Sequence, residues 1–464
     1  MFRKGEPSWK IQLPVYQCDQ EESQFSSREV ENFSCFRALK ESSKDKSVPA
    51  QSSKSKPLIQ RVPSTLSERK DYKKYFEPRV VAIGPLHHKN SRLQPAEKAK
   101  LDLAVQFTNE RDVSEQELYK KIKKEMRDLK KCYRPKDIED YDDEELAWMF
   151  FVDGCAALHA MHYTRLEKQK DLNIKVDLLA FAQLDLFMLE NQLPFRVLEL
   201  LMSSVKNGKH LRESINLFID DKIKKTLAAG TEQPPLEAGD QEHTHLLGLL
   251  RERLLANPKQ TKKPKNTLIG QVLRSLGPTE ADKTFRSINE LKEAGIRVSR
   301  SETSSLRDVN FSVGFLGTLT IPRIVADDST GSKFMNLVAY EMCPDFENDF
   351  GVTSYLCFLD SLIDKAQDVK ELRHAGMLLN YMGSDEEVAH LFNNITTDLV
   401  PDLGMYRGVT EDIRKYCDNP WTTCIAKAYY THFSTPWSIL AFLGAVLGLI
   451  FTAIQAYYSM RRKG

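Results

Sequence analysis

Along most of the chain, hydrophobic residues recur every three or four positions, which is the spacing of one helix face. The pattern is clearest in three stretches, at residues 96–108, 114–132 and 143–166. Ser114 and Glu117 have the spacing of a capping box, which predicts the start of the second helix. The same period returns from residue 333 to 399 and continues to about 429. The sequence therefore predicts a mainly α fold.

One short region departs from the helical period. β-Branched and aromatic residues gather at 296–298, 309–311 and 319–325, with Gly314 and Gly317 between them. This pattern is typical of a small antiparallel sheet or hairpin, so the fold class is α+β with a β patch near 296–325. Earlier, an apolar run at 80–83 comes directly before a Gly-Pro turn, which predicts a short strand or an extended arm.

Polar segments divide the chain into parts. Residues 1–57 end in a stretch rich in Ser, Lys and Pro, which predicts a disordered N-terminal extension. Residues 58–430 would form a large helical domain. Within it, residues from about 205 to 285 read as a loop-rich insert around one helix at 245–255.

The most distinctive segment is the apolar run at 437–458, since no Asp, Glu, Lys or Arg occurs between Lys427 and Arg461. A helix of this length spans roughly 33 Å, enough to cross a hydrocarbon core of roughly 30 Å. We therefore predict a single transmembrane helix, a lipid bilayer as partner, and a basic tail at 459–464. The residues expected at the membrane interfaces are Trp437, Tyr457, Tyr458, Arg461, Arg462 and Lys463.

Within this helix Gly444, Gly448, Thr452 and Ala456 recur every four residues, so they lie along one side. Such a stripe lets two helices approach closely, and we expect it to support self-association or a protein partner. The alternative is that these small residues simply face lipid.

Two arguments about orientation conflict. The N-terminus lacks the continuous apolar stretch of a signal peptide, which favours a cytosolic domain at the plasma membrane or an endomembrane. The basic tail favours the opposite orientation by the positive-inside rule. We give the first argument more weight, because translocating a large folded domain needs a route.

Composition excludes some classes of function. The chain has 66 Lys and Arg against 65 Asp and Glu, so nothing in its charge favours a nucleic-acid partner. Its eight cysteines form no CxxC pair, and neither a metal site nor a cofactor is expected. In a cytosolic domain these cysteines would be reduced.

Three groups of residues could carry chemistry, and each has a plainer interpretation. Cys155, His159 and His162 would share one helix face, but a fourth metal ligand is missing, and Asp153-Gly154 before them favours a helix start. His87 and His88 are adjacent, so we interpret them as loop residues. The carboxylates that could pair for acid–base work are Asp177, Asp185 and Glu190.

Glu190, Asn191 and Gln192, followed by Pro194, separate two apolar helical stretches. They are expected at a helix junction, where polar side chains satisfy free backbone groups and Glu190 ties a helix end or pairs with a buried arginine.

Several short motifs together resemble the plant-specific "domain of unknown function 247" family, also called UPF0481. The likeness runs from about Ile59 to Tyr458. The motifs that carry it are Pro78-Arg79, IGPLHH (83–88), VDGC (152–155), LENQLPF (189–195), EAGI (293–296), Ile321-Pro322, NLVAYEMC (336–343), DVKEL (368–372), GSDEEVAHLFN (383–393) and Pro436-Trp437. Positions that depart from the family pattern are Leu86, Ala156, Ala157, His159 and Arg196.

The resemblance implies a mostly helical, single-pass plant membrane protein without an established biochemical activity. Some family members in grasses are associated with pollen self-incompatibility, which implies recognition. We therefore favour a non-enzymatic interaction or signalling protein. The alternative is a membrane-associated enzyme, such as a hydrolase that uses Cys155 or carboxylates.

Overall fold

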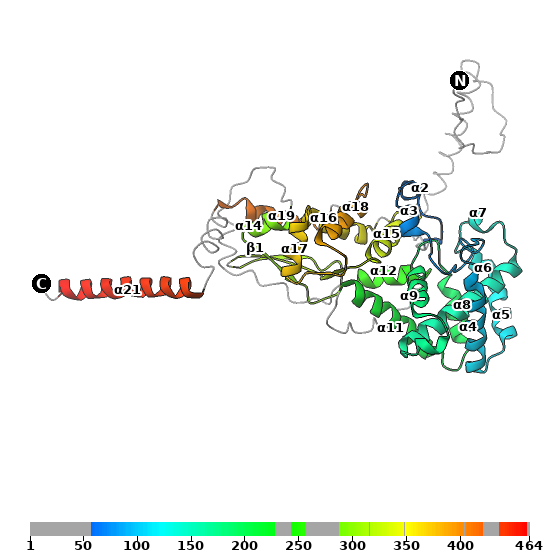
Figure 1. The fold of residues 1–464 in the computed structure, drawn as a ribbon. Helices are drawn as coiled ribbons and strands as arrows, with labels where there is room; N and C mark the ends of the chain where they lie inside the picture. Colours follow the sequence, from blue (N-terminus) through cyan, green and yellow to red (C-terminus); the bar gives the residue numbers. More distant parts are fainter. Residues whose placement is uncertain are drawn as a thin grey trace, which may run out of the picture. The chain divides into compact units, whose positions relative to one another are not determined.

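A computed structural model describes residues 57–227, 243–256, 287–314, 316–347, 349–402, 404–420 and 436–461. Helices dominate these residues, which confirms the mainly α fold (Figure 1). The predicted extension before residue 57 and the polar stretches at 228–242 and 257–286 lie outside them.

In the first half of the chain, in the described residues before 257, every regular element is helical. The helices are α2 (Ser64–Ser67), α3 (Tyr72–Phe76), α4 (Pro95–Arg111), α5 (Glu115–Lys124), α6 (Met126–Lys130), α7 (Pro135–Ile138), α8 (Asp143–Arg165), the short 3-10 helix η1 (Gln169–Leu172), α9 (Val176–Asp185), α10 (Phe195–Ser203), α11 (Gly208–Leu227) and α12 (Leu246–Leu254). The stretch predicted to be loop-rich therefore contains a 20-residue helix, α11.

Helix α8 is the centre of this half, since α4, α5, α10 and α11 all pack against it. Asp142 and Glu145 cap its start reciprocally, and three acidic residues occupy its first turn. Asp153 and Gly154 lie in its middle, so the expected helix start at these residues is wrong. Glycine serves close packing there, because a Cβ on Gly154 would lie 2.6 Å from the Leu201 side chain of α10.

The second half mixes helices with short strands. Its helices are α14 (Ile288–Glu293), α15 (Thr330–Glu341), α16 (Gly351–Leu362), α17 (Ala366–His374), α18 (Asp385–Ile395) and α19 (Arg407–Cys417). Its strands are β1 (Ile296–Arg300), β2 (Asn310–Val313), β3 (Gly317–Ile321), β4 (Ile324–Ala326) and β5 (Leu378–Asn380). A separate helix, α21 (Pro436–Arg461), follows.

The β patch occurs where it was predicted, but its topology is mixed. Strands β2 and β3 form the expected antiparallel pair, whereas β1 joins the other edge of β3 in parallel. The stretch predicted as one strand at 319–325 is broken at Pro322, which has no amide hydrogen to donate to a sheet. Its second part, β4, pairs in parallel with β5, in a region predicted to be helical.

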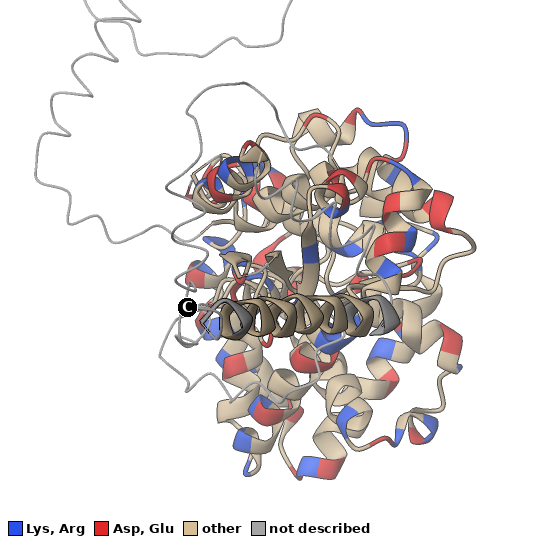
Figure 2. Ribbon diagram, turned by 90° about the vertical axis from the view of Figure 1, so that its left-hand side faces the viewer, with Lys and Arg blue, Asp and Glu red and all other residues tan. Residues whose placement is uncertain are grey.

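One continuous hydrophobic core joins the helical half to the sheets. It includes large side chains that are fully buried in both halves, among them Phe150, Phe195, Phe334 and Phe392. On the face that Figure 2 turns toward the viewer, basic and acidic residues are interspersed.

Candidate functional site

Residues 79–84 run as an extended arm that joins no sheet, and buried side chains bind its backbone instead. Its first three amides donate to the Asp185 carboxylate at 2.8–3.0 Å. Asn191 accepts the Ile83 amide at 2.7 Å and donates to the Val81 carbonyl at 3.1 Å. Buried backbone groups without hydrogen-bond partners are energetically costly, and here these two side chains supply the partners that a neighbouring strand would otherwise provide. Asp185 is therefore a structural acceptor, occupied by the arm.

A buried ion pair between α4 and α8 holds the end of the same arm. Lys100 Nζ lies 2.5 Å from Asp153 Oδ1 and donates to the Ala82 carbonyl at 2.8 Å. The other oxygen of Asp153 accepts the Gly84 amide at 2.8 Å. Burial alone would lower the pKa of Lys100, but the Asp153 carboxylate, together with Glu97 at 2.8 Å, outweighs burial and raises it. The lysine is therefore charged, and Asp153 has its partners within the fold.

The turn after the arm requires glycine. Gly84 has φ +72°, and a Cβ there would lie 2.6 Å from the Gln192 carbonyl oxygen. That oxygen accepts the Tyr133 hydroxyl at 2.9 Å. Gln192 Nε2 donates to the carbonyls of Leu186 and Met188 at 2.7 and 2.8 Å. Asn191 and Gln192 therefore hydrogen-bond to backbone groups at a helix junction, which is the role expected of this polar trio.

Helix α15 closes the network from the second half of the chain. Asn336 Oδ1 accepts the Leu189 amide at 2.8 Å, and Nδ2 donates to the Tyr75 carbonyl at 2.8 Å. Pro194 is the residue directly before α10. Motifs IGPLHH, VDGC, LENQLPF and NLVAYEMC therefore meet at one place, which we call the junction network. Its members are Gly84, Lys100, Asp153, Asp185, Asn191, Gln192 and Asn336.

Glu190 lies at the edge of the junction network. Its Oε1 accepts the Val62 amide at 2.8 Å and the Tyr72 hydroxyl at 3.2 Å. Its Oε2 lies 3.3 Å from Arg61 Nη1 and 3.4 Å from His87 Nε2. Burial alone would raise the pKa of Glu190, but His87, the Val62 amide and Arg61 outweigh it and lower the pKa. Glu190 does pair with an arginine, although Arg61 is more than half exposed rather than buried.

A second carboxylate, Asp137, flanks the same arginine, with its Oδ1 3.5 Å from Arg61 Nε. Burial raises the pKa of Asp137, whereas that of Glu190 is lowered. Opposed shifts of this kind are what acid–base catalysis uses. Here, however, both oxygens of Glu190 face groups of this chain, so the cluster fixes the segment around Arg61 against α3 and α7. The other histidine, His88, faces Glu97 at 3.9 Å instead.

The face of α8 that could have held a metal has its side chains turned to different neighbours. Cys155 is fully buried, and burial raises the pKa of its thiol. His159 lies 3.3 Å from Gln106 Oε1 and 3.4 Å from Arg111 Nη1, and burial lowers its pKa to about 4. His162 Nδ1 is 3.0 Å from Ser214 Oγ on α11. Within the described ranges, no three His, Cys, Asp or Glu side chains form a group that could hold a metal ion.

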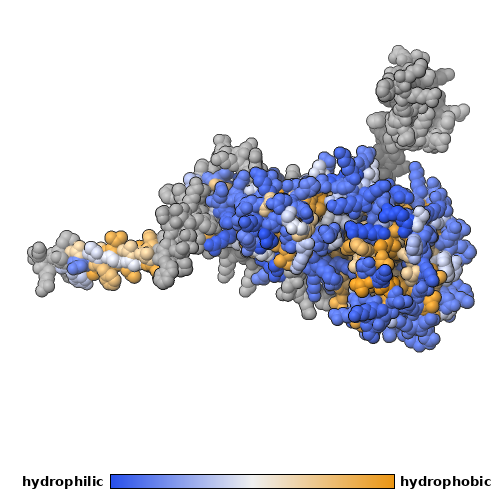
Figure 3. All heavy atoms as spheres, viewed as in Figure 1, coloured by the Kyte–Doolittle hydropathy of each residue, from blue (hydrophilic) through white to orange (hydrophobic). Residues whose placement is uncertain are grey.

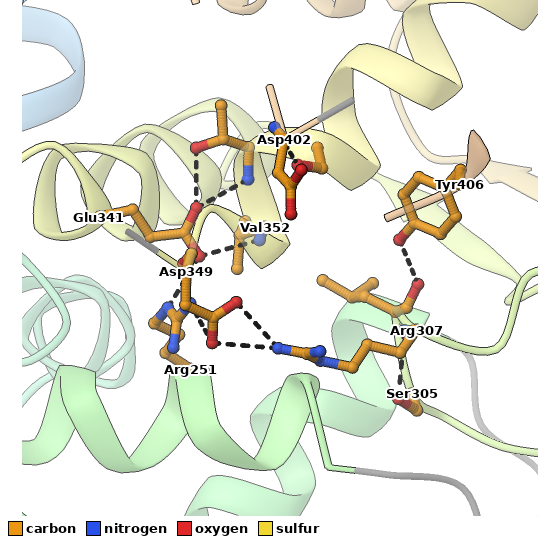
Figure 4. Close-up of polar contacts among 11 residues, drawn as sticks. Arg251, Ser305, Arg307, Glu341, Asp349, Val352, Asp402 and Tyr406 are labelled. Carbon is orange, nitrogen blue, oxygen red and sulfur yellow. Dashed lines mark hydrogen bonds and ion pairs between the residues drawn. The ribbon is translucent and has the colours of Figure 1, made fainter. Parts of the chain in front are cut away.

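A further buried network, shown in Figure 4, was missed from the sequence. Arg251 Nε donates to Glu341 Oε1 at 2.7 Å, and the same carboxylate accepts the amides of Val352 and Thr353 at 2.9 Å each. An anionic side chain stabilises the start of a helix, so Glu341 caps α16. The sequence does contain a hint of this ion pair: Glu341 and Arg251 each interrupt an apolar run, and a charged residue buried in such a run needs a partner of opposite charge.

Helix α21 contains a segment, Leu440–Tyr458, that is long and apolar enough to cross a membrane. Length and composition alone support this, and they agree with the predicted span at 437–458. Tyr457 and Tyr458 are exposed near its end. The side chains of Trp437 and Arg461, and residues Arg462 and Lys463 entirely, lie outside what the structure describes.

Comparison with known proteins gives the chain a family. The sequence model of DUF247, described as "Plant protein of unknown function", matches residues 59–451. The chain belongs to the DUF247 family. This confirms the resemblance that the short motifs carried, and the DUF247 match extends into α21.

Two DUF247-type relatives come from Arabidopsis thaliana. The UPF0481 protein At3g47200 is 28% identical over 82% of each chain. The putative UPF0481 protein At3g02645 is 24% identical over 82% of this chain and 86% of its own. No solved structure matches the chain significantly.

Proposed function

We propose that this DUF247 protein is anchored in a membrane by α21 and acts there by binding a protein partner rather than by catalysis. The apolar segment Leu440–Tyr458 supports the anchor. The binding role rests on a different helix, α9.

Helix α9 has apolar residues on every side, yet half of its ten residues are exposed. Only Leu179 and Asp185 are buried among its ten residues, while Val176, Leu178 and Phe181 are 65%, 43% and 38% exposed. Figure 3 shows apolar surface gathered where Figure 1 places α9 and α4. A helix that is apolar all round is normally enclosed. A bilayer surface would cover only one face of it, whereas a groove in a protein encloses several, and this favours a protein partner.

Two features support a cytosolic position for the helical domain. Asn394, which lies in an N-glycosylation sequon, donates from Nδ2 to Asp71 at 2.9 Å, and its carbonyl accepts Arg69 at 2.8 Å. A glycan on that nitrogen would compete with the Asp71 contact. Among the described residues, Cys155, Cys343, Cys357 and Cys417 are free thiols, as is usual in a reducing compartment.

The alternative, a hydrolase with Cys155 as nucleophile, has less support. A nucleophilic cysteine needs a lowered pKa and access to substrate. Cys155 is fully buried, and its pKa is raised.

The binding role can be tested with a double variant, Leu178→Asp with Phe181→Asp, in the full chain. Proximity labelling in plant cells should lose a defined set of neighbours compared with wild type. Val400→Asp is the matched control, because Val400 is also apolar and 77% exposed but lies outside α9. Equal labelling by wild type, the α9 variant and the control would refute a docking role for α9.

Self-association through α21 stays a prediction. A Cβ on Gly444 or Gly448 would meet nothing within 4 Å, so the stripe is open to a neighbouring helix. Thr452 donates to the Gly448 carbonyl within its own helix at 2.8 Å, and Ala456 continues the same side. We expect Gly444→Ile with Gly448→Ile to reduce association in a membrane reporter assay, and unchanged association would contradict the prediction.

A further inference from the structure

A cavity of about 380 Å³ lies where the ends of α4 and α8 meet the start of α11. Its walls include Arg111, His162, Arg165 and His210, with Glu110 as the one carboxylate. Small-molecule sites typically enclose about 300–1,000 Å³, so the cavity is large enough for a compact ligand.

A second hollow of about 700 Å³ shares Asn207 and His210 with this cavity. It adds four cationic side chains, Arg196, Lys206, Lys209 and Arg212, and one carboxylate, Glu199. The two hollows therefore bring together six Lys and Arg side chains and two carboxylates, in a chain whose net charge is only +1. This local excess of positive charge favours an anionic ligand.

Surrounding carboxylates neutralise only part of this charge. Arg196 binds Glu125 through two contacts of 2.8 Å, and Arg212 lies 2.9 Å from Glu199. Arg165 lies 3.4 Å from Glu213.

Arg111 is more deeply buried than Arg165, the other arginine of the cavity. The Arg111 side chain is only 9% exposed, and the Glu110 carboxylate is 3.7 Å away. The other oxygen of Glu110 accepts the Tyr163 hydroxyl.

Arg111 Nη1 donates to the Phe107 carbonyl at 3.1 Å and lies 3.4 Å from His159 Nδ1, and both of these partners are uncharged groups of its own surroundings. Burial lowers the pKa of Arg111, which is the direction expected when nearby carboxylates do not fully offset burial. An anion bound in the cavity would supply further negative charge next to the Arg111 guanidinium.

The start of α11 adds a favourable dipole. This helix has 20 residues and no acidic residue in its first turn, so the positive end of its dipole is not neutralised there. Gly208 fits the tight entry into the helix, since a Cβ would lie 2.0 Å from the Met202 carbonyl oxygen.

We propose that this basic cavity binds a small ligand that carries a phosphate monoester, with Arg111 and Arg165 as its anchors and Lys206 and Lys209 contributing positive charge from the adjoining hollow. Guanidinium groups suit phosphate because they donate two parallel hydrogen bonds to its oxygens. The phosphate monoester belongs either to a soluble metabolite or to a lipid headgroup. The experiment below distinguishes these sources.

The test uses the full chain in phosphatidylcholine nanodiscs, titrated with glycerol 3-phosphate by calorimetry. We expect saturable binding, and Arg165→Gln with Lys209→Gln should weaken it at least about tenfold. Arg407→Gln is the control, because Arg407 is 76% exposed, also pairs with a glutamate, and lies on α19. Binding by the control should equal wild type.

A second set of nanodiscs contains phosphatidic acid, whose headgroup is itself a phosphate monoester. Loss of glycerol 3-phosphate binding in these discs supports the site and assigns it to a lipid, whereas unchanged binding supports it and assigns it to a soluble ligand. Three results would overturn the proposal: no saturable binding in phosphatidylcholine discs, equal affinity for sulfate, or the same affinity in the Arg165 and Lys209 double variant as in wild type.

Discussion

Removing the buried carboxylate of the junction network should destabilise the protein strongly. In Asp153→Ala, Lys100 loses its contact at 2.5 Å and the Gly84 amide loses its acceptor. Both charged side chains are almost fully buried, at 4% and 1% exposure. Breaking a buried ion pair from one side costs about 3–5 kcal/mol. Glu97 Oε1, 2.8 Å from Lys100 Nζ, still compensates part of the remaining charge, so the loss should lie toward the lower end of this range. For a large domain, the range corresponds to a fall in melting temperature of about 6–10 °C.

The assay is thermal unfolding of the full chain in detergent, followed by tryptophan fluorescence. Asp128→Ala is the matched control: its partner Lys131 is also a lysine, at 2.6 Å, but the two side chains are 72% and 66% exposed. Solvent screening should keep that shift within about 1 °C. Lys100→Met added to Asp153→Ala should recover part of the loss, since no buried charge is left unpaired. Equal shifts for Asp153→Ala and Asp128→Ala would refute the argument from burial.

A strained turn, a buried histidine and two buried thiols give three further predictions. Gly84→Ala should lower the melting temperature more than Gly376→Ala. Both glycines have positive φ, but only at Gly84 would the added Cβ approach a backbone atom closely. Equal falls in melting temperature would show that this contact does not matter. Burial lowers the pKa of His245 from its usual 6.5 to about 3, so below about pH 6.5 the unfolded chain binds a proton that the folded chain does not. The stability of the protein should therefore fall as the pH drops below about 6.5. The variant His245→Asn can still cap α12, and its melting temperature should fall less than that of wild type between about pH 7 and pH 5. Burial also raises the pKa of the Cys155 and Cys343 thiols, so both should resist alkylation at neutral pH in the folded protein and react after unfolding. Mass spectrometry of the alkylated protein measures this. Rapid alkylation of either thiol in the folded protein would contradict its burial.

Local patterns predicted most helices, because periodicity and capping act over a few residues. Helix α8 shows this, since its apolar period and the acidic cap at Asp142 lie within its own sequence. Partner choice between strands could not be predicted in the same way. Strand β4 pairs with β5, whose residues lie 54 positions later, and a short apolar run such as 377–379 reads equally well as helix.

The junction network was predictable only in part. Glu190, Asn191 and Gln192 stood out as polar residues between apolar stretches, and the structure does place them at a helix junction. The partners of Glu190 could not be identified, because Arg61 and Tyr72 lie in a polar stretch that reads as surface. The buried Lys100 of the same network likewise looks like an ordinary surface charge in sequence. Burial comes from the packing of distant segments, which no local pattern records.

The claim that the protein is membrane-anchored with a cytosolic domain is tested most directly by protease protection on sealed microsomes that contain the full chain, with a separate sample extracted by alkaline carbonate. We predict that the chain stays in the membrane pellet, that added protease digests residues 58–420, and that Asn310 and Asn394 carry no glycan. Release of the intact chain into the carbonate supernatant would contradict the anchor. A protected domain glycosylated at both asparagines would contradict the cytosolic position.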